Sequence, residues 1–340
     1  MKRWRRAALI IGMPSMLSML VAAAARPLGA QGPAKAGTVV TDTLWSQSLG
    51  ARKSVVLYLP PSYALSRARR YPVAYYLHGL GGRETDWTQH GMLAQVMDSL
   101  VAAGGPEMII VMPDGDDSWY TTWNTLLDVS VCRRNPPETH ESVDTYCVPW
   151  PHYDDYIARD LVQFTDKKYR TKAERAHRAI GGLSMGGYGA MSLSLGYPEL
   201  FSAAASHSGV ISPLFGGPKP FTGEKPVWAP DGASLEKGWA RYWLSIGPAF
   251  GKDTAAWWSR DPGRRLEKLV ARKGKSAVPA LFVDCGTEDD LIGNNRVFRW
   301  VAEKNGVSVT YHEWPGAHGW AYWRAHLPES LSWIGARIAP

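Results

Sequence analysis

The sequence has few cysteines, no internal repeat and no long apolar run after its first residues. Its three cysteines show no Cys/His spacing typical of a zinc site, so no metal is predicted. Beyond the N-terminal stretch, no segment reaches about 18 uninterrupted apolar residues, so the rest of the chain is expected to be soluble. The 34 glycines and 24 prolines are scattered, which disfavours collagen-like, coiled-coil and wholly disordered chains. What remains is a globular composition.

Acidic residues are missing from the first 30 positions, where five basic residues stand. The formal net charge of the whole chain is +7. Without these five, 33 of the 38 basic side chains remain against 31 acidic ones, a balance of +2. This near-neutral balance gives no electrostatic reason to expect a nucleic-acid partner. The five are Lys2, Arg3, Arg5, Arg6 and Arg26.

The N-terminal stretch has the pattern of a secretory signal peptide. Basic residues at 2–6 precede an apolar segment at 7–25, and small residues follow up to position 30. We expect residues 1–30 to be removed, which would leave a secreted or periplasmic protein without a stable membrane anchor. The alternative is an uncleaved anchor, but Pro14 and two serines weaken this segment as a membrane span. The export route and the cleavage site stay open.

Two cysteines flank a polar, proline-containing stretch within an insertion at about 124–150. Since an oxidising compartment favours disulfides, we predict a bond between Cys132 and Cys147. Closing a loop of about 15 residues would stabilise the fold by roughly 3 kcal/mol. Cys285 follows an apolar run and is predicted to be a buried strand residue.

The remaining sequence alternates short apolar runs with helix-like segments. Residues 39–49 and 53–59 predict an antiparallel pair of strands. Further strands are predicted at 73–77, 108–112, 179–182, 203–207, 280–284 and 307–313, and helices at 151–169, 186–196, 291–305 and 320–338. Such alternation indicates one α/β domain over residues 31–340, with a mainly parallel sheet covered by helices on both faces. Residues 208–270 are rich in Pro, Gly and Trp, which predicts a partly helical cap insertion over the sheet edge.

The most informative motif is Gly182-Leu183-Ser184-Met185-Gly186. It is a G-x-S-x-G pattern with a short apolar strand before it and an Ala/Leu-rich helix after it. A serine hydroxyl becomes a useful nucleophile when it is exposed beside a base and near donors for an oxyanion. We therefore predict Ser184 as a nucleophile and the Met185 N–H as an oxyanion donor. The alternative is a glycine-rich turn with an incidental serine.

A second oxyanion donor is predicted in the loop that follows residues 73–77. The segment His78-Gly-Leu-Gly-Gly82 contains three glycines, which allow the backbone to turn an amide inward. The Leu80 N–H is the expected donor, and a plain glycine turn is the alternative. His78 precedes the nucleophile motif, and a structural role is predicted for it.

The general base is expected to follow the serine and the acid in the chain. Four histidines lie after Ser184, namely His207, His312, His318 and His326. Among them, His318 occupies a Gly-containing turn between the last strand and the last helix, where its ring can extend over the sheet. We predict His318 as the base.

The acid is expected in the turn after residues 280–284. This turn offers Glu288, Asp289 and Asp290, and the residues alone leave the choice open. Asp284 lies before the turn, and a structural role is predicted for it.

Together these motifs resemble the esterase D-like family of α/β-hydrolases. That family includes feruloyl and acetylxylan esterases, S-formylglutathione hydrolases, enterochelin esterases and mycolyltransferases. The similarity covers roughly residues 40–335 and implies the α/β-hydrolase fold. It also implies that the acid is Asp289 and that the oxyanion donors are the amides of Leu80 and Met185. The motifs are 56–63, 71–73, 77–82, 112–115, 118–120, 182–190, 285–289 and 316–320.

The expected function is a secreted serine hydrolase that acts on carboxylic esters through an acyl-enzyme, without a cofactor. The resemblance implies small-molecule or glycan ester substrates, such as feruloyl or acetyl esters of sugars. Trp119, Trp123 and Trp320 lie near the motif loops and could stack on a sugar or phenolic ring. For any single one of them, packing in the core or cap is the preferred interpretation. One alternative is an acyltransferase of the mycolyltransferase type; another is a non-catalytic carbohydrate- or protein-binding module. The oligomeric state is left open.

Overall fold

The computed structural model describes residues 1, 36–135, 142–218, 220–223 and 225–339. The predicted signal peptide therefore lies outside the described residues, apart from Met1. Within these ranges, no helix combines the length and apolar character needed to cross a membrane.

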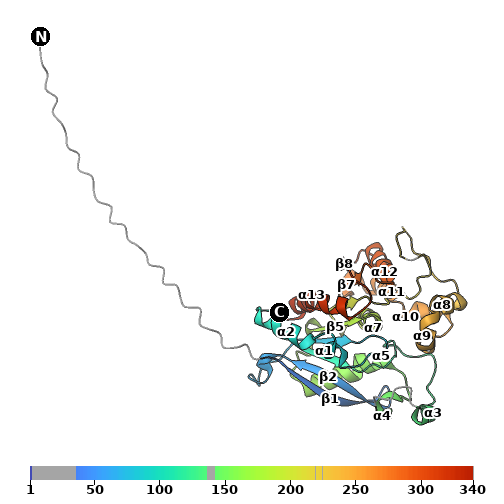
Figure 1. The fold of residues 1–340 in the computed structure, drawn as a ribbon, viewed down its shortest axis with the longest axis horizontal. Helices are drawn as coiled ribbons and strands as arrows, with labels where there is room; N and C mark the ends of the chain where they lie inside the picture. The colour runs from blue at the N-terminus through green and yellow to red at the C-terminus, as the bar shows by residue number, and fades with distance from the viewer. Residues whose placement is uncertain (2–35, 136–141, 219, 224, 340) are drawn as a thin grey trace. The chain divides into compact units, whose positions relative to one another are not determined.

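The framework is an eight-stranded sheet in the order β1-β2-β4-β3-β5-β6-β7-β8 (Figure 1). The pairs β1–β2 and β2–β4 are antiparallel, and the other neighbours are parallel. The strands are β1 (Thr38–Ser46), β2 (Ala51–Leu59), β3 (Val73–Leu77), β4 (Ile109–Pro113), β5 (Arg178–Leu183), β6 (Ala203–His207), β7 (Ala280–Gly286) and β8 (Val309–Trp314). Each lies within two residues of a predicted apolar run at its start, so the strand predictions are confirmed.

Helices cover both faces of the sheet, as predicted. One face packs against α6 (Val162–Lys168), α7 (Met185–Gly196), α11 (Pro262–Lys273) and α12 (Ile292–Lys304). The other face packs against α1 (Asp86–Gln89), α2 (Leu93–Ala102) and α13 (Trp320–Ile338). The predicted helix at 151–169 is built from α5 (Tyr153–Asp155), a π-helical turn at Tyr156–Leu161, and α6.

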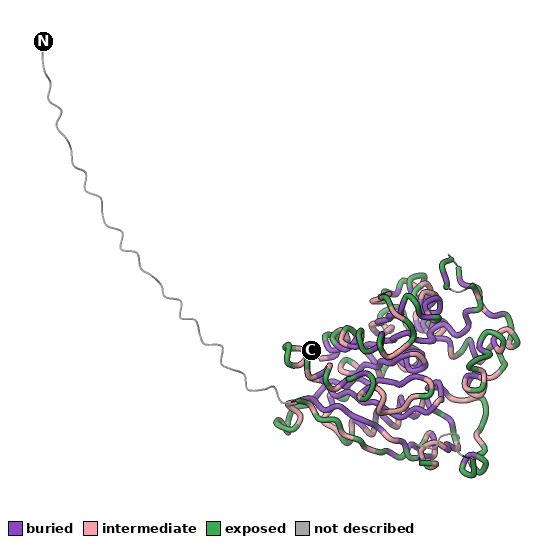
Figure 2. Tube along the Cα trace, viewed as in Figure 1, coloured by how far each residue is buried: buried purple, intermediate pink, exposed green. Residues whose placement is uncertain are grey.

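The two hydrophobic layers follow from the period-two alternation of strand side chains. On β3, Tyr75 and Leu77 belong to the layer under α7, whereas Ala74 and Tyr76 belong to the layer under α13. All five residues of β3 are buried, which is why this strand is a continuous apolar run in the sequence. Figure 2 shows the same arrangement as buried strands inside a shell of more exposed helices.

The segment 208–270 is partly helical, as predicted, but its last helix belongs to the main framework. It contains α8 (Gly232–Gly238), α9 (Trp243–Phe250), α10 (Thr254–Arg260) and the start of α11. Helix α11 packs against α7 and places Leu266 and Leu269 in the core. The cap therefore ends before Pro262, because the apolar face of α11 is needed to cover the sheet.

The disulfide prediction is confirmed: Cys132 and Cys147 are bonded. Their segment contains α3 (Val129–Arg134) and α4 (Val143–Tyr146), and residues 136–141 between them lie outside the described ranges. Cys285 is buried in β7, as predicted.

Candidate active site

Ser184 stands in a tight turn between β5 and α7. Its backbone has φ +52° and ψ −116°, a conformation that a residue with a side chain adopts only when its surroundings hold it there. Its N–H donates to the carbonyl of His207 at 2.9 Å, and its own carbonyl accepts from Tyr188 N–H at 3.0 Å. These two bonds fix the turn and leave the Ser184 hydroxyl at the carboxyl end of the strand.

Two glycines of the G-x-S-x-G motif are required by close backbone contacts. A Cβ atom at Gly186 would lie 2.3 Å from the carbonyl oxygen of Leu77 and 2.5 Å from that of His78. A Cβ atom at Gly182 would lie 2.4 Å from the carbonyl oxygen of Gly186. Glycine therefore lets α7 begin directly against both β5 and the loop that follows β3.

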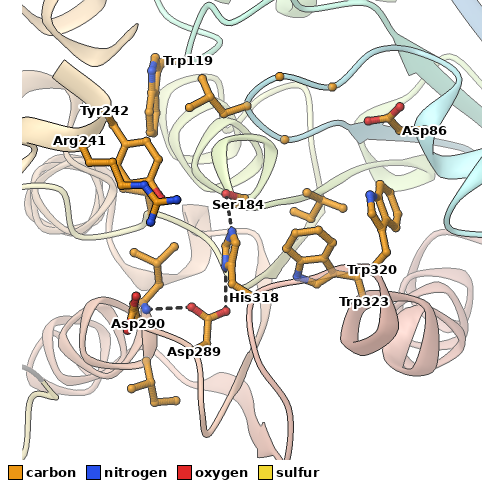
Figure 3. Close-up of a pocket in the computed structure, with 18 of the residues that line it drawn as sticks. Asp86, Trp119, Ser184, Arg241, Tyr242, Asp289, Asp290, His318, Trp320 and Trp323 are labelled. Carbon is orange, nitrogen blue, oxygen red and sulfur yellow. Dashed lines mark hydrogen bonds and ion pairs between the residues drawn. The ribbon is translucent and has the colours of Figure 1, made fainter. Parts of the chain in front are cut away.

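Ser184, His318 and Asp289 form a hydrogen-bonded chain, called here the open trio (Figure 3). His318 Nε2 lies 2.9 Å from Ser184 Oγ, and His318 Nδ1 lies 2.8 Å from Asp289 Oδ2. Because a carboxylate accepts, Nδ1 carries the proton and Nε2 is free to accept from the serine hydroxyl. The trio thus has the geometry of a nucleophile, a base and an orienting acid.

Asp289 is held in its ionised form. Burial favours the neutral carboxyl, but the hydrogen bond and charge of His318 and the Leu291 N–H outweigh it and lower the pKa of Asp289. Glu288 and Asp290 are exposed, whereas Asp289 is 2% exposed. The turn therefore separates one carboxylate from its two neighbours, in agreement with the choice that the family resemblance implied.

Three other histidines follow Ser184 in the chain, and the structure places them away from its hydroxyl. His312 and His326 stack on Trp314, with ring centroids 4.6 and 4.1 Å away. His207 is fully buried and contacts Asp284, with Nδ1 2.6 Å from Oδ2. Asp284 is thus occupied within the core.

The buried histidine is part of a second Ser–His–Asp chain, called here the buried trio. His207 Nε2 lies 2.7 Å from Ser330 Oγ, which also lies 3.0 Å from the hydroxyl of Tyr76. His207, Asp284 and Ser330 are all 0% exposed. No substrate can reach this chain in the described structure.

The loop His78–Gly82 lies beside Ser184, as predicted. The Gly82 N–H closes it by donating to the Gly79 carbonyl at 3.0 Å. Among the hydrogen bonds of the described residues, none uses the Leu80 N–H as a donor. This amide and that of Met185, which opens α7, are the two predicted oxyanion donors, and Leu80 lines the same cavity as Ser184.

His78 is occupied within the protein. Its Nε2 accepts from the Gly115 N–H at 2.9 Å, so its Nδ1 carries the proton and donates to the Gly79 carbonyl at 2.8 Å. The ring is 0% exposed. These contacts agree with the structural role predicted for His78.

The open trio faces a cavity of about 1090 Å³. Its walls include five tryptophan or tyrosine side chains and carry charges of both signs (Figure 3). The aromatic side chains are Trp119, Trp239, Tyr242, Trp320 and Trp323, and the charged ones include Arg83, Asp86, Arg241 and Asp290. No cluster of three potential metal ligands occurs among the described residues.

Of the three tryptophans predicted near the site, two line the cavity. Trp119 and Trp320 do so, whereas Trp123 does not line the cavity and packs within the fold, the interpretation preferred for any single one of them. The Trp123 ring packs 6.0 Å from that of Tyr153, and its N–H donates to the Ser118 carbonyl at 2.9 Å. Its indole N–H is therefore bound within the segment 118–123.

Two cavity residues of the cap were not predicted individually. Arg241 and Tyr242 come from the short 3₁₀ turn Ala240–Tyr242, and in Figure 3 they lie beside Trp119, with Arg241 directed toward the open trio. The sequence analysis described residues 208–270 as a cap insertion rich in Pro, Gly and Trp and named neither residue as part of the site. A residue's place on the cavity side depends on how the cap folds back, which local composition does not show.

Comparisons with known proteins agree with this site and fold. The model of the Esterase family, described as "Putative esterase", matches residues 46–334. An acetyl esterase from Caldicellulosiruptor saccharolyticus is 24% identical over 262 residues, 76% of this chain and 82% of that protein. An endo-1,4-beta-xylanase/feruloyl esterase from Xylanibacter ruminicola is 30% identical over 168 residues, 48% of this chain and 20% of that protein.

A solved structure of a ferulic acid esterase superposes with a TM-score of 0.66 at 27% identity, covering 89% of this chain and 99% of that one. Together with the strand order, this match confirms the predicted α/β-hydrolase fold.

Proposed function

The chain belongs to the esterase family, and on this premise we propose that it is a secreted serine hydrolase of carboxylic esters. The observation that carries the proposal is the hydrogen-bonded chain of Ser184, His318 and Asp289, open to a cavity of about 1090 Å³. The catalytic domain would comprise residues 31–340. Export is proposed from the basic and apolar pattern of residues 1–30.

The first half of the reaction forms an acyl-enzyme. Ser184 Oγ attacks the ester carbonyl carbon while His318 Nε2 takes the hydroxyl proton, and the carbonyl electron pair moves to the oxygen. The amides of Leu80 and Met185 stabilise this oxyanion, and the N-terminus of α7 adds its positive dipole end. Asp289 stabilises the imidazolium. Collapse of the intermediate breaks the ester C–O bond, and His318 returns the proton to the departing alcohol.

The second half releases the acid. A water molecule attacks the carbonyl carbon of the acyl group bound to Ser184 Oγ, and His318 Nε2 accepts the proton of the water. The same two amides stabilise the oxyanion that forms. Collapse restores the Ser184 hydroxyl with the proton that His318 returns. Apart from the substrate and this water molecule, the groups used in these steps come from the chain itself.

We propose feruloyl or acetyl esters of sugars as the substrate class. The names of the acetyl and feruloyl esterase relatives support this, and so do the aromatic walls of the cavity. Indole and phenol rings such as Trp320 and Tyr242 can stack against a phenolic ring or the apolar face of a sugar.

The test is hydrolysis of p-nitrophenyl acetate, methyl ferulate and acetylated xylo-oligosaccharides by the protein and its Ser184→Ala variant. We expect the variant to lose nearly all activity, because the nucleophile itself is removed. The matched control is Ser259→Ala, which removes an exposed serine on α10 whose hydroxyl bonds only to its own helix. Equal rates in Ser184→Ala and the wild type would refute the proposal. Acylated sugar formed with a sugar acceptor present would instead indicate acyl transfer.

A further inference from the structure

We propose that Asp117 is a positioning residue for the oxyanion hole and that a buried ion cluster around Lys53 holds it in place. The inference rests on the proposed function, since it concerns the Leu80 amide of the same site. It adds Asp117 and Lys53 to the residues that support the site. Both act on the open trio indirectly, through the loop His78–Gly82.

Asp117 fixes the peptide next to the proposed oxyanion donor. Its Oδ1 accepts from the Gly81 N–H at 2.6 Å. Gly81 has φ +72°, and a Cβ atom at this position would meet no heavy atom within 4 Å. The space beside the Gly81 Cα is therefore open on that side, and the Asp117 carboxylate provides a directional contact to the Gly81 N–H. Because the two peptides that flank Leu80 share its Cα atom, fixing one restricts how the Leu80 N–H points.

The loop that carries Asp117 also binds the other end of the oxyanion loop. The Gly115 N–H donates to His78 Nε2 at 2.9 Å, and the Tyr120 hydroxyl donates to the His78 carbonyl at 3.1 Å. Residues 114–120 thus bind the loop at His78 and again at Gly81. With both ends bound to the same segment, the position of the Leu80 amide depends on the position of that segment.

This supporting segment has an unfavourable backbone conformation. Asp116, Trp119 and Tyr120 have φ values of +46°, +58° and +47°. Residues with side chains keep such values only where surrounding contacts enforce them. The segment therefore needs strong contacts on the side away from the oxyanion loop.

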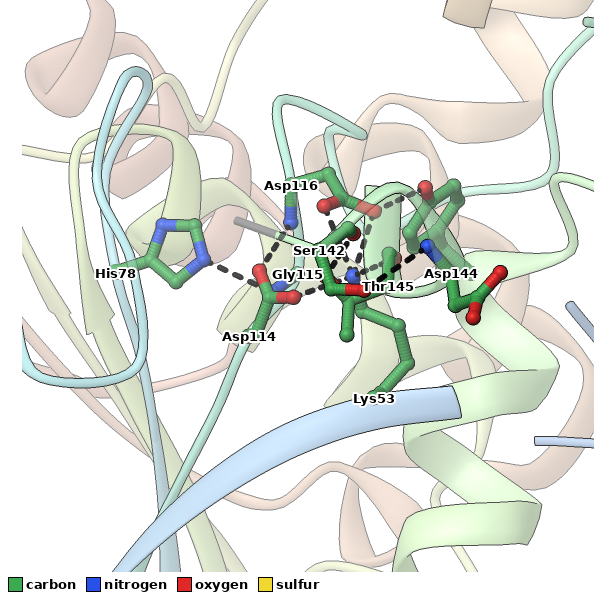
Figure 4. Close-up of polar contacts among 9 residues, drawn as sticks. Lys53, His78, Asp114, Gly115, Asp116, Ser142, Asp144 and Thr145 are labelled. Carbon is green, nitrogen blue, oxygen red and sulfur yellow. Dashed lines mark hydrogen bonds and ion pairs between the residues drawn. The ribbon is translucent and has the colours of Figure 1, made fainter. Parts of the chain in front are cut away.

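Lys53 supplies these contacts (Figure 4). It lies on β2 with 0% exposure, and its Nζ donates to both oxygens of Asp116, at 2.8 and 2.9 Å. It also pairs with Asp114 and donates to the Thr145 carbonyl at 2.7 Å. The Tyr153 hydroxyl donates to Asp116 at 2.5 Å. One buried cation thereby joins β2, both carboxylates of the supporting segment and the disulfide-bonded segment.

The buried charges of this cluster are stable only when they are paired with one another. Burial would lower the pKa of Lys53, but Asp114 and Asp116 outweigh it and raise that pKa above its usual value. Burial and Asp114 raise the pKa of Asp116, and Lys53 opposes them. A buried ion pair that loses one partner leaves an uncompensated charge, which strongly destabilises the fold. The pairing therefore keeps Lys53, Asp114 and Asp116 in a defined geometry.

The decisive experiment compares Asp117→Ala with Asp117→Asn in ester hydrolysis. We expect Asp117→Ala to lower kcat about tenfold with KM within twofold, which is less than the loss of a whole oxyanion donor. A trifluoromethyl ketone analogue of the acyl group, which mimics the oxyanion, should bind about tenfold more weakly. Asp117→Asn keeps an acceptor for the Gly81 N–H and should retain kcat close to the wild-type value.

The matched control is Asp253→Ala, which removes a carboxylate that accepts from the Ala255 N–H at 2.9 Å, away from the cavity. It should leave kcat and inhibitor binding unchanged. Wild-type kcat in Asp117→Ala, or an equal loss in Asp117→Asn, would overturn the inference while leaving the proposed function intact. Absence of Ser184-dependent hydrolysis in the wild type would overturn the proposed function itself.

The role of the cluster is tested separately, because Lys53→Met leaves two buried carboxylates unpaired and can prevent folding. Tyr153→Phe removes one hydrogen bond to Asp116 and leaves the cation paired. We expect kcat to fall two- to threefold with KM nearly unchanged, and the melting temperature to fall as well because a buried hydrogen bond is lost. An unchanged kcat in this variant would overturn the role given to the cluster.

Discussion

The open trio and the buried trio consist of the same three residue types joined in the same order. In the open trio, the serine lies at the start of α7 and faces a large cavity that Leu80 also lines. In the buried trio, Ser330 lies inside α13, and its hydroxyl donates to the Leu327 carbonyl at 3.1 Å. Its oxygen therefore accepts from His207, whereas Ser184 donates to His318.

The difference shows which features the chemistry requires. A Ser–His–Asp chain becomes a nucleophile only with solvent access, a serine proton directed at the base and amides placed for an oxyanion. The buried trio has none of these within the described structure, and its groups serve as polar connections between β6, β7 and α13. The experiments below test whether only the open trio takes part in the reaction.

The largest expected effect is the loss of the orienting acid. Asp289→Asn should lower kcat by about 10⁴-fold, because the amide no longer selects the tautomer with the proton on His318 Nδ1. Steady-state hydrolysis of p-nitrophenyl acetate measures it. Asp290→Asn, which changes the exposed neighbour, should remain close to the wild type. A larger loss of kcat in Asp290→Asn than in Asp289→Asn would show that Asp289 is not the orienting acid.

The buried trio should matter for stability and not for turnover. Ser330→Ala leaves His207 Nε2 and the Tyr76 hydroxyl without a partner, so the free energy of unfolding should fall by about 1–3 kcal/mol. The value of kcat should stay within twofold. Urea unfolding and ester hydrolysis measure the two quantities. Ser194→Ala is the control, since this buried serine bonds only to its own helix. Loss of activity in Ser330→Ala with its fold intact would contradict this assignment.

The cavity is the feature that the buried trio lacks, and its aromatic wall should act on substrate binding. Trp320→Ala should raise KM for methyl ferulate up to about tenfold and change KM for a simple acetyl ester much less, because only the larger acyl group reaches a stacking surface. Trp45→Ala removes a tryptophan that is 53% exposed on β1 and should change neither. An equal rise for both esters would show that Trp320 shapes the fold and not the acyl pocket.

The smallest expected effect is the pH dependence of stability contributed by Asp289. Its pKa is lowered in the folded state, so its contribution is present above the unfolded-state pKa near 4 and is lost as pH falls through the folded value. Asp289→Asn should therefore be less stable than the wild type at pH 7, by on the order of 1 kcal/mol. The gap should shrink below about pH 4. Urea titrations at both pH values test this, and a constant gap would contradict it.

Elements that depend on a local sequence pattern were predicted correctly. Buried parallel strands are short apolar runs, and so β3 and β6 have the predicted bounds. Helix α2 was missed because its start lacks a side-chain cap: Met92 precedes it with φ +54° and no capping hydrogen bond. Helix α11 begins with the Asp261 cap and Pro262 but stands in a Trp- and Pro-rich segment that suggested a cap domain.

The same contrast holds for the site. Ser184 and His318 lie in glycine-containing turns that the sequence motifs identify. The choice among the three adjacent acids depends instead on which carboxylate the folded turn buries. The supporting cluster was not predicted as a unit. Its contacts join Gly81 to Asp117 and Lys53 to Asp116, across 36 and 63 positions of the chain. No periodicity connects such positions, and only the packed fold brings them together.

The Cys132–Cys147 bond has a practical consequence for anyone who prepares this protein. The chain has three cysteines, so a denatured sample should titrate one thiol when the bond is present and three when it is absent. Material produced in a reducing cytosol would lack the bond, and the Thr145 carbonyl that accepts from Lys53 would lose its covalent brace. The thiol count of each batch is therefore the number to record before rates from different hosts are compared.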